Sequence, residues 1–316
     1  MTPFRVITCV VLLLLIGCDQ SVDKQKVKIA LNPWPGYEYI YLAEQKGFFA
    51  DQGLNIEVVE MSSLADVQRV YIQGRVDAFA STLIEVVQVV GSLDASVTVF
   101  HIADFSNGGD IIMANDSIKD VKALKGKRVG AEIGSLGMYI LALALDKNGL
   151  SLSDVDVVNV EQLDAKESMA SNKVDAMVTY PPFSTNIIEL GNMKVLFSTE
   201  ELPGDVIDTV TINSELMSTL PDDWLKRFSM AWDRALSYAE ANPDDAHKIM
   251  AEREGLSVEE FRDALTGLTV LTFVESEKAK RSPKTKANLK KVCQTLKFAG
   301  SKDLDCPKIE SLILFE

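Results

Sequence analysis

After an apolar N-terminal segment, short apolar runs alternate with amphipathic stretches of helical period. The runs predict strands at residues 27–31, 55–60 and 76–80, and the stretches between them predict helices at 37–50 and 64–73. Short strands separated by helices of this size are typical of β-α-β units, in which neighbouring strands run parallel. The pattern therefore predicts an α/β fold with a largely parallel sheet.

The following segment repeats this pattern. Residues 127–131 match the opening strand, and Gly149 and Leu150 stand where Gly53 and Leu54 stood in the first half. The clearest match is between residues 74–78 (GRVDA) and 172–176 (NKVDA). Repetition at a fixed spacing indicates a duplicated structural unit, so we expect two similar α/β halves.

The C-terminal part is helical. Residues 222–241 place Trp224, Phe228 and Trp232 on one face, which predicts a helix packed against the core. Asn242 and Pro243 have the residue types that cap and begin the next helix, Gly255 the type that ends it, and residues 257–260 form a capping box for a third.

The N-terminal segment has the features of an export signal. Arg5 precedes an apolar stretch at 6–16, which is too short for a spanning helix of about 20 residues. Residues 15–18 (LIGC) resemble the bacterial lipobox, in which the cysteine is acylated and becomes the mature N-terminus. We therefore expect a lipoprotein signal peptide at 1–17, lipidation of Cys18 and a short polar tether at 18–25. The alternative is a chance cysteine after an ordinary signal peptide.

The charge balance and the motifs bear on which partners and cofactors are expected. The chain has 316 residues with 32 Lys and Arg against 46 Asp and Glu, a formal net charge of −14. A nucleic-acid binder needs a basic face, so nucleic acid is not an expected partner. Basic residues crowd only residues 278–291, where they are interpreted as a solvated surface, with contact to anionic lipid or a partner protein as the alternative. Two histidines and the absence of C-x-x-C, P-loop or G-x-G-x-x-G motifs predict neither a metal nor a cofactor.

The cysteines agree with export. Cys9 would be removed with the signal and Cys18 lipidated, which leaves Cys293 and Cys306. Two cysteines in an exported domain are expected to pair as a disulfide, and two free buried thiols are the alternative.

The loops after the predicted strands carry the candidate site, because ligands bind at the carboxyl ends of parallel strands. Two loops are rigid and aromatic, and two offer hydroxyl and backbone N–H groups at helix starts, a favourable arrangement for an anion. The candidate ligand-binding residues are Trp34, Gly36, Tyr37, Ser81, Thr82, Ser135, Leu136, Gly137 and Tyr180. Packing of Trp34 within its own lobe and ordinary N-capping by the hydroxyl residues remain alternatives.

Catalytic chemistry has little support in the sequence. Ser135 has no base partner at the level of a motif, so no catalytic residue is predicted. Asp104, Asp110 and Asp208 could form a carboxylate pair, or they could bond backbone groups near a hinge.

Several short motifs together resemble the nitrate/sulfonate/taurine-type periplasmic binding proteins of ABC importers. They are residues 32–38 (NPWPGYE), 46–49 (KGFF), 74–78 (GRVDA), 124–130 (LKGKRVG) and 180–182 (YPP). The resemblance implies the type II periplasmic-binding-protein fold, in which two α/β lobes are joined by two crossovers. One lobe would comprise 26–105 and 208–316 and the other 106–207, with crossovers near 106–109 and 202–204.

By the same resemblance, the protein would capture a small solute between the lobes and deliver it to a permease and its ATPase. It would act as a monomer, anchored by lipid on the periplasmic face of the inner membrane. Glu38, Glu85 and Glu132 lie near the candidate loops, where a receptor for a bare anion would avoid acids. A sulfonate, an amino-acid-like zwitterion or a pyrimidine-like compound is therefore expected as the solute.

Two other functions stay open at this stage. A lipoprotein of this fold could present its ligand to a membrane receptor instead of a transporter. A pyrimidine synthase that resembles this family consumes its own histidine and uses iron, but it carries a cysteine-rich motif that this chain lacks.

The lipobox generates the first prediction. Protein isolated from its native host should partition into detergent, because an acylated N-terminus binds membranes. Mass spectrometry should find acylated Cys18 as the first residue of the mature chain. An intact segment 1–17, or an unmodified Cys18, would contradict the lipoprotein assignment.

Overall fold

The computed structural model describes residues 25–299 and 303–315, and the predicted signal peptide, Cys18 and nearly all of the tether lie outside them. The described residues contain two β-sheets. Sheet A has the strand order β11-β4-β10-β3-β1-β2, with β12 also paired to β4. Its strands are β1 (Lys26–Leu31), β2 (Asn55–Glu60), β3 (Ala78–Thr82), β4 (Val97–Ser106), β10 (Ile207–Asn213), β11 (Leu268–Val270) and β12 (Ile313–Phe315).

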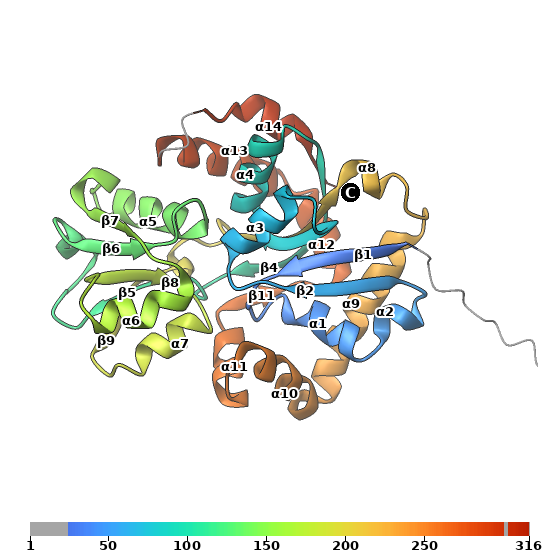
Figure 1. The fold of residues 1–316 in the computed structure, drawn as a ribbon, viewed down its shortest axis with the longest axis horizontal. Helices are drawn as coiled ribbons and strands as arrows, with labels where there is room; N and C mark the ends of the chain where they lie inside the picture. Colours follow the sequence, from blue (N-terminus) through green and yellow to red (C-terminus); the bar gives the residue numbers. More distant parts are fainter. Residues whose placement is uncertain (1–24, 300–302, 316) are drawn as a thin grey trace, which may run out of the picture.

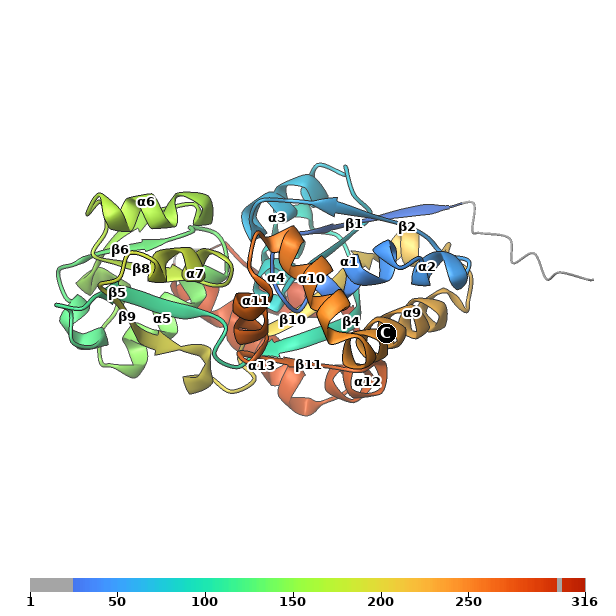
Figure 2. The same ribbon diagram turned by 90° about the horizontal axis from the view of Figure 1, so that it is seen from below.

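Sheet B has the order β7-β6-β8-β5-β9. Its strands are β5 (Ile111–Asn115), β6 (Arg128–Ala131), β7 (Asp156–Asn159), β8 (Ala176–Thr179) and β9 (Met193–Ser198). The helices beside sheet B are α5 (Leu136–Lys147), α6 (Ala165–Ala170) and α7 (Phe183–Ile188). We call the part built on sheet A lobe A and the part built on sheet B lobe B; the two lie side by side in Figures 1 and 2.

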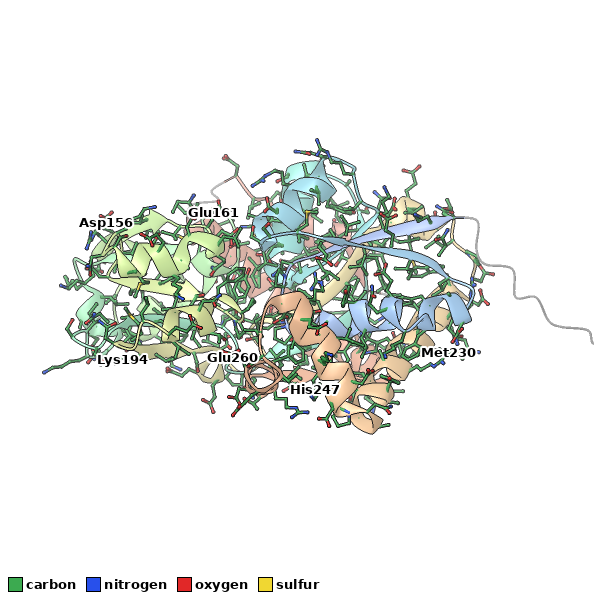
Figure 3. All side chains as sticks on the ribbon, turned by 60° about the horizontal axis from the view of Figure 1, so that its bottom comes forward. Asp156, Glu161, Lys194, Met230, His247 and Glu260 are labelled. Atoms are coloured by element: carbon green, nitrogen blue, oxygen red, sulfur yellow. A yellow bond between two sulfur atoms is a disulfide. The ribbon has the colours of Figure 1, made fainter. Side chains whose placement is uncertain are left out.

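The remaining α-helices belong to lobe A. They are α1 (Glu38–Gln45), α2 (Phe48–Asp51), α3 (Leu64–Ile72), α4 (Leu83–Leu93), α8 (Ser214–Met217), α9 (Trp224–Ala241), α10 (Pro243–Glu254), α11 (Val258–Leu265), α12 (Phe273–Lys280), α13 (Pro283–Phe298) and α14 (Cys306–Leu312). None of the helices in the described part of the chain combines the length and apolar character needed to span a bilayer. Charged side chains such as Asp156 and Lys194 point outward from lobe B in Figure 3.

The chain passes between the lobes twice. It leaves sheet A after β4 and enters sheet B at β5, then returns from β9 to β10. On its return, β10 inserts antiparallel between β3 and β4, while β1 pairs in parallel with β2 and β3. The predicted architecture of two α/β lobes joined by two crossovers is confirmed.

Several predicted element boundaries differ from the structure. The helix predicted at 37–50 is two helices, because Gly47 has φ +71° and breaks the helical path before α2. The strand predicted at 76–80 lies two residues later, since pairing with β10 extends it to Thr82. Ser81 and Thr82 therefore lie inside β3 and not in a loop after it. Asn242 stands at the expected N-cap of α10, but its side chain makes no capping hydrogen bond and donates to the Tyr238 carbonyl instead.

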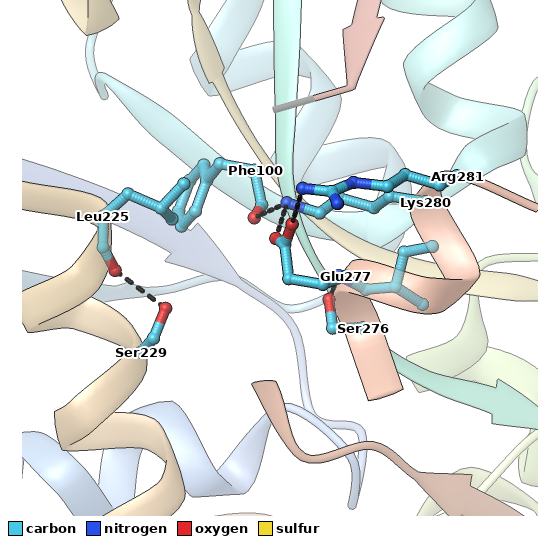
Figure 4. A network of polar contacts seen from close by, with 8 residues as sticks. Phe100, Leu225, Ser229, Ser276, Glu277, Lys280 and Arg281 are labelled. Atoms are coloured by element: carbon cyan, nitrogen blue, oxygen red, sulfur yellow. Dashed lines mark hydrogen bonds and ion pairs between the residues drawn. The ribbon is translucent and has the colours of Figure 1, made fainter. Parts of the chain in front are cut away.

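Aromatic side chains hold α9 to sheet A. Phe228 packs edge-on against Phe100 of β4, and Trp232 packs at 4.5 Å from the ring of the buried His101. Helix α12 is held by polar contacts, which Figure 4 shows: Lys280 donates to the Phe100 carbonyl at 2.8 Å and pairs with Glu277. Interpreting residues 278–291 as a solvated surface is therefore wrong for Lys280, which is 2% exposed.

The expected disulfide between Cys293 and Cys306 is present and joins α13 to α14. Helix α13 also contacts the second crossover, since Asn288 donates to the carbonyls of Gly204 and Asp205 and Lys291 pairs with Asp205. Helix α14 leads directly into β12, which pairs with β4. The disulfide thus links α13, which supports the second crossover, to the segment that adds β12 to sheet A.

Removing the disulfide should destabilise the protein. The bond closes a loop with a sequence separation of 13, and a loop of this size is worth roughly 3 kcal/mol in the chain-entropy model. We expect the double variant Cys293→Ser/Cys306→Ser to lose about 2–3 kcal/mol in urea unfolding. Reductant should lower the stability of the wild type but not that of the variant; a wild type indifferent to reductant would contradict the prediction.

Candidate functional site

A small cavity, with a volume of about 10 Å³, lies between the lobes. It is lined by Asn32, Trp34, Tyr37, Leu64, Thr82 and Asp208 from lobe A, Leu136 and Tyr180 from lobe B, and Asp110 at the first crossover. Five of the nine candidate residues line it: Trp34, Tyr37, Thr82, Leu136 and Tyr180. The other four, Gly36, Ser81, Ser135 and Gly137, are adjacent in sequence but are not among its lining residues.

The loop between β1 and α1 places two aromatic side chains in this cavity. The Trp34 indole N–H donates to Asp104 at 3.3–3.4 Å, and its ring meets Tyr180 of lobe B edge-on at 5.9 Å. The Tyr37 hydroxyl donates to Asp208 at 2.5 Å. Trp34 therefore contacts both lobes, and the alternative that it packs only within its own lobe is wrong.

The acceptors of these two bonds form a buried carboxyl pair. Asp104 on β4 lies directly opposite Asp208 on β10, and both are at most 2% exposed. Burial raises the pKa of Asp104 to about 7, and burial together with repulsion from Asp104 raises the pKa of Asp208 well above its ordinary value. The two carboxyls lie within hydrogen-bond reach of each other, so they can share a proton.

The carboxyl pair also explains why residue 36 is a glycine. A Cβ atom at this position would lie 1.9 Å from Asp104 Oδ2, so any other residue would push the carboxylate away. The role of Gly36 in the site is therefore to admit the Asp104 side chain.

A third carboxyl group joins the lobes. Glu85 at the start of α4 accepts hydrogen bonds from the hydroxyl and N–H groups of Thr82, and its other oxygen accepts from the Leu136 N–H at 2.8 Å. Leu136 is the first residue of α5 in lobe B, so a carboxyl group from lobe A occupies the N-terminus of that helix. Burial raises the pKa of Glu85 to about 7, although these bonds act in the opposite direction.

The two expected anion sites are thus already used by the protein. Thr82 forms a capping box with Glu85, so ordinary N-capping is the correct interpretation there. At the start of α5, the N–H group of Leu136 is bound by Glu85, and the Ser135 hydroxyl donates to the Glu132 carbonyl.

The three glutamates considered in the sequence have separate roles. Glu38 does not line the cavity; it forms a buried ion pair with Arg253 of α10. Glu85 contacts two lining residues but is not itself one, and Glu132 is buried outside the lining. The acids that do line the cavity are Asp110 and Asp208.

The cavity is therefore acidic, and its described lining includes no lysine or arginine. Sequence reasoning left Asn32, Leu64, Asp110 and Asp208 out of the site. The sequence offers Asp104, Asp110 and Asp208 as a carboxylate pair or as hinge residues, and the structure forms the pair from Asp104 and Asp208. The positions of Asp110 and Asp208 beside the two crossovers are the signal that could have placed them here. Asn32 directly follows β1, and Leu64 is the first residue of α3 after β2, so both stand between a strand and the next helix, as Trp34 does.

Comparison with known proteins identifies the family of this chain. A family model described as NMT1/THI5 like matches residues 34–246, more than half of the chain, beginning at the cavity residue Trp34. The chain belongs to the NMT1/THI5-like family. A Haemophilus influenzae protein named for thiamine biosynthesis is 26% identical to this chain over 230 residues. The match covers 72% of this chain and 73% of that protein.

Two further similarities extend the comparison. The Saccharomyces cerevisiae protein named 4-amino-5-hydroxymethyl-2-methylpyrimidine phosphate synthase THI11 is 27% identical over 157 residues, 49% of this chain and 46% of its own. The structure of the periplasmic aliphatic sulphonate binding protein SsuA from Escherichia coli matches with a TM-score of 0.75 and 16% identity, over 90% of this chain and 94% of that one. The predicted periplasmic-binding-protein fold is thereby confirmed.

The carboxyl pair predicts an unusual pH dependence. Asp104 has a pKa of about 7 in the folded protein against an ordinary 3.8, so the folded state holds a proton that the unfolded chain loses. Its contribution to stability therefore falls as the pH rises between these values, by about 1.4 kcal/mol per unit. When the pH is raised from 5 to 8, the free energy of unfolding of Asp104→Asn should therefore rise by roughly 2 kcal/mol relative to that of the wild type.

Urea unfolding at several pH values measures this difference. Glu259→Gln, which removes an exposed carboxylate on α11, is the matched control and should follow the wild-type pH profile. A constant difference between Asp104→Asn and the wild type across this range would show that Asp104 is ionised throughout.

Proposed function

We propose that this protein is the exported solute-binding component of an ABC importer. It captures a small polar organic solute in the cavity between its lobes and, as a monomer anchored through Cys18, delivers it to a permease with its ATPase. The observation that carries this proposal is the cavity itself, which both lobes and the first crossover line. Sites of this kind, concave and between domains, are where small ligands bind.

Contacts between the lobes surround the cavity and would break if the lobes separated. Asn32 donates to the Tyr180 hydroxyl at 3.4 Å, Gln68 donates to the Gly134 carbonyl at 3.0 Å, and Leu136 donates to Glu85 at 2.8 Å. This arrangement supports a closed state that a solute would stabilise, with hinge motion at the two crossovers as the route to opening.

The acidic lining bears on which solute is bound. A sulfonate would enter a cavity beside Asp110 and Asp208, with no described cation to receive it, so it fits poorly. The names of the Haemophilus and yeast relatives refer to thiamine biosynthesis and to a 4-aminopyrimidine. A pyrimidine-like solute is therefore the best supported of the three expected classes.

A binding role also fits better than catalysis. The yeast relative is named as a synthase, and the resemblance to such enzymes requires a histidine at the reacting centre. Neither histidine of this chain lines the cavity. His101 is buried against Trp232, and His247, labelled in Figure 3, lies on α10 facing α11, where it packs against Phe261.

Solute-induced closure is the test. Screening sulfonates, amino acids and aminopyrimidines by thermal unfolding should give a hit, because a ligand at 100 times its Kd stabilises by about 2.7 kcal/mol. The same compound should reduce the radius of gyration in solution scattering. Trp34→Phe, which removes the bond to Asp104, should weaken the shift, while Met230→Ala on the exposed face of α9 should not.

The proposal would be overturned if no compound of any charge stabilised the protein. It would also be overturned if binding compounds acted equally on Trp34→Phe and left the scattering radius unchanged.

A further inference from the structure

We propose that the solute is a planar organic cation, such as a protonated amine or amidine, whose N–H groups bind Asp110, Asp208 and Asn32. This inference deepens the proposed function, on which it rests, by naming the charge and donor pattern of the solute. It depends on three features of the cavity: unpaired acceptors, the acidic groups around them, and the aromatic and apolar walls.

The cavity presents buried acceptors without donors. Among the described residues, Asp110 Oδ2 and Asn32 Oδ1 have no hydrogen-bond partner, although both residues are 1% exposed. In the described part of the chain Asp208 Oδ2 has no hydrogen-bond partner either. A buried acceptor left without a donor is costly, so the complementary solute is one that supplies N–H groups on this side.

The groups around these acceptors are acidic, and burial raises the pKa of each. Asp104, Asp110, Asp208 and Glu85 are all buried within this region, and each is at most 2% exposed. The lining includes no cationic side chain, and the helix end that would attract an anion is bound by Glu85. A positive solute is attracted by the carboxyl groups and favours their ionised form, whereas a negative solute meets only like charge.

The walls are largely aromatic and apolar. The rings of Trp34, Tyr37 and Tyr180 and the side chains of Leu64 and Leu136 line the cavity, so it is apolar on the sides away from the acids. With the lobes in this position the cavity volume is about 10 Å³, room for about one water molecule, so a ring-sized solute would enter as the lobes move apart. Aromatic faces also attract cations, which strengthens the preference.

An inorganic cation fits less well. Within residues 25–299 and 303–315, no three histidine, cysteine, aspartate or glutamate side chains are placed to hold a metal ion. Carboxyl and amide oxygens beside apolar walls suit an organic cation that has several N–H groups and an apolar body.

Charge selectivity of the wild-type protein is the direct test. The protein is titrated by calorimetry at pH 8 with three one-ring cations: benzamidine, 4-aminopyridine and benzylamine. The comparison compounds are the neutral benzamide, the anions benzoate and benzenesulfonate, and Ca²⁺. We expect at least one ring cation to bind with a Kd at least tenfold below those of benzamide, of both anions and of Ca²⁺. Tighter binding of an anion or of Ca²⁺, or binding of no cation in the set, would overturn the inference.

Variants then locate the site. Asp110→Asn and Asp208→Asn keep the shape of the side chain and remove its charge, so each should raise the Kd of that cation at least tenfold. Glu259→Gln removes an exposed charge and should leave it unchanged. Unchanged affinity in both aspartate variants would place the cation elsewhere and overturn the inference. Lobe closure induced by benzenesulfonate would overturn it too, yet would leave the proposed transport function standing.

Discussion

The position of β10 determines where the carboxyl pair lies and how the cavity around it is arranged. By entering antiparallel between β3 and β4, this strand brings Asp208 opposite Asp104 at the point where the chain passes between the lobes. Two carboxyl groups in such a place need donors, and the loop after β1 supplies them through the Trp34 indole and the Tyr37 hydroxyl. The same loop requires Gly36, because no side chain fits beside Asp104. The hydrogen bonds to the carboxyl pair therefore fix the positions of Trp34 and Tyr37 in the aromatic wall of the cavity.

Glu85 has a corresponding role between the lobes. The N-terminus of a long helix carries free N–H groups and partial positive charge, and it readily binds an anion. In this chain the anion is a side chain of the opposite lobe, which also caps its own helix through Thr82. The bond consequently contributes to holding the lobes together and removes a position where an anionic solute would otherwise bind. One interaction thus affects both closure and selectivity.

The sequence predicted the repeated α/β halves and most of the aromatic wall, because these depend on local period and on strand ends; its resemblance to a known family implied the two crossovers. It did not predict which acids face the cavity. Asp208 reaches the cavity only because β10 is inserted between two earlier strands, and Glu38 is turned away by Arg253, a partner 215 positions along the chain. Contacts at such separations leave no local pattern. The two-residue displacement of β3 has the same origin, since the strand is extended by pairing with β10.

The acidic cavity also suggests how occupancy and closure would be linked under the proposed function. In the closed arrangement Asp104, Asp110 and Asp208 are withdrawn from water, and each must either hold a proton or remain charged in an apolar setting. Opening the lobes would return water to these groups and remove that penalty. A solute that brings positive charge and N–H donors removes the same penalty without opening, because its charge offsets theirs. Such a solute binds the closed state more tightly than the open one, and this difference in affinity is what shifts the population towards closure. Burial of the carboxyl groups therefore accounts for both the preferred charge of the solute and the coupling of its binding to the movement of the lobes.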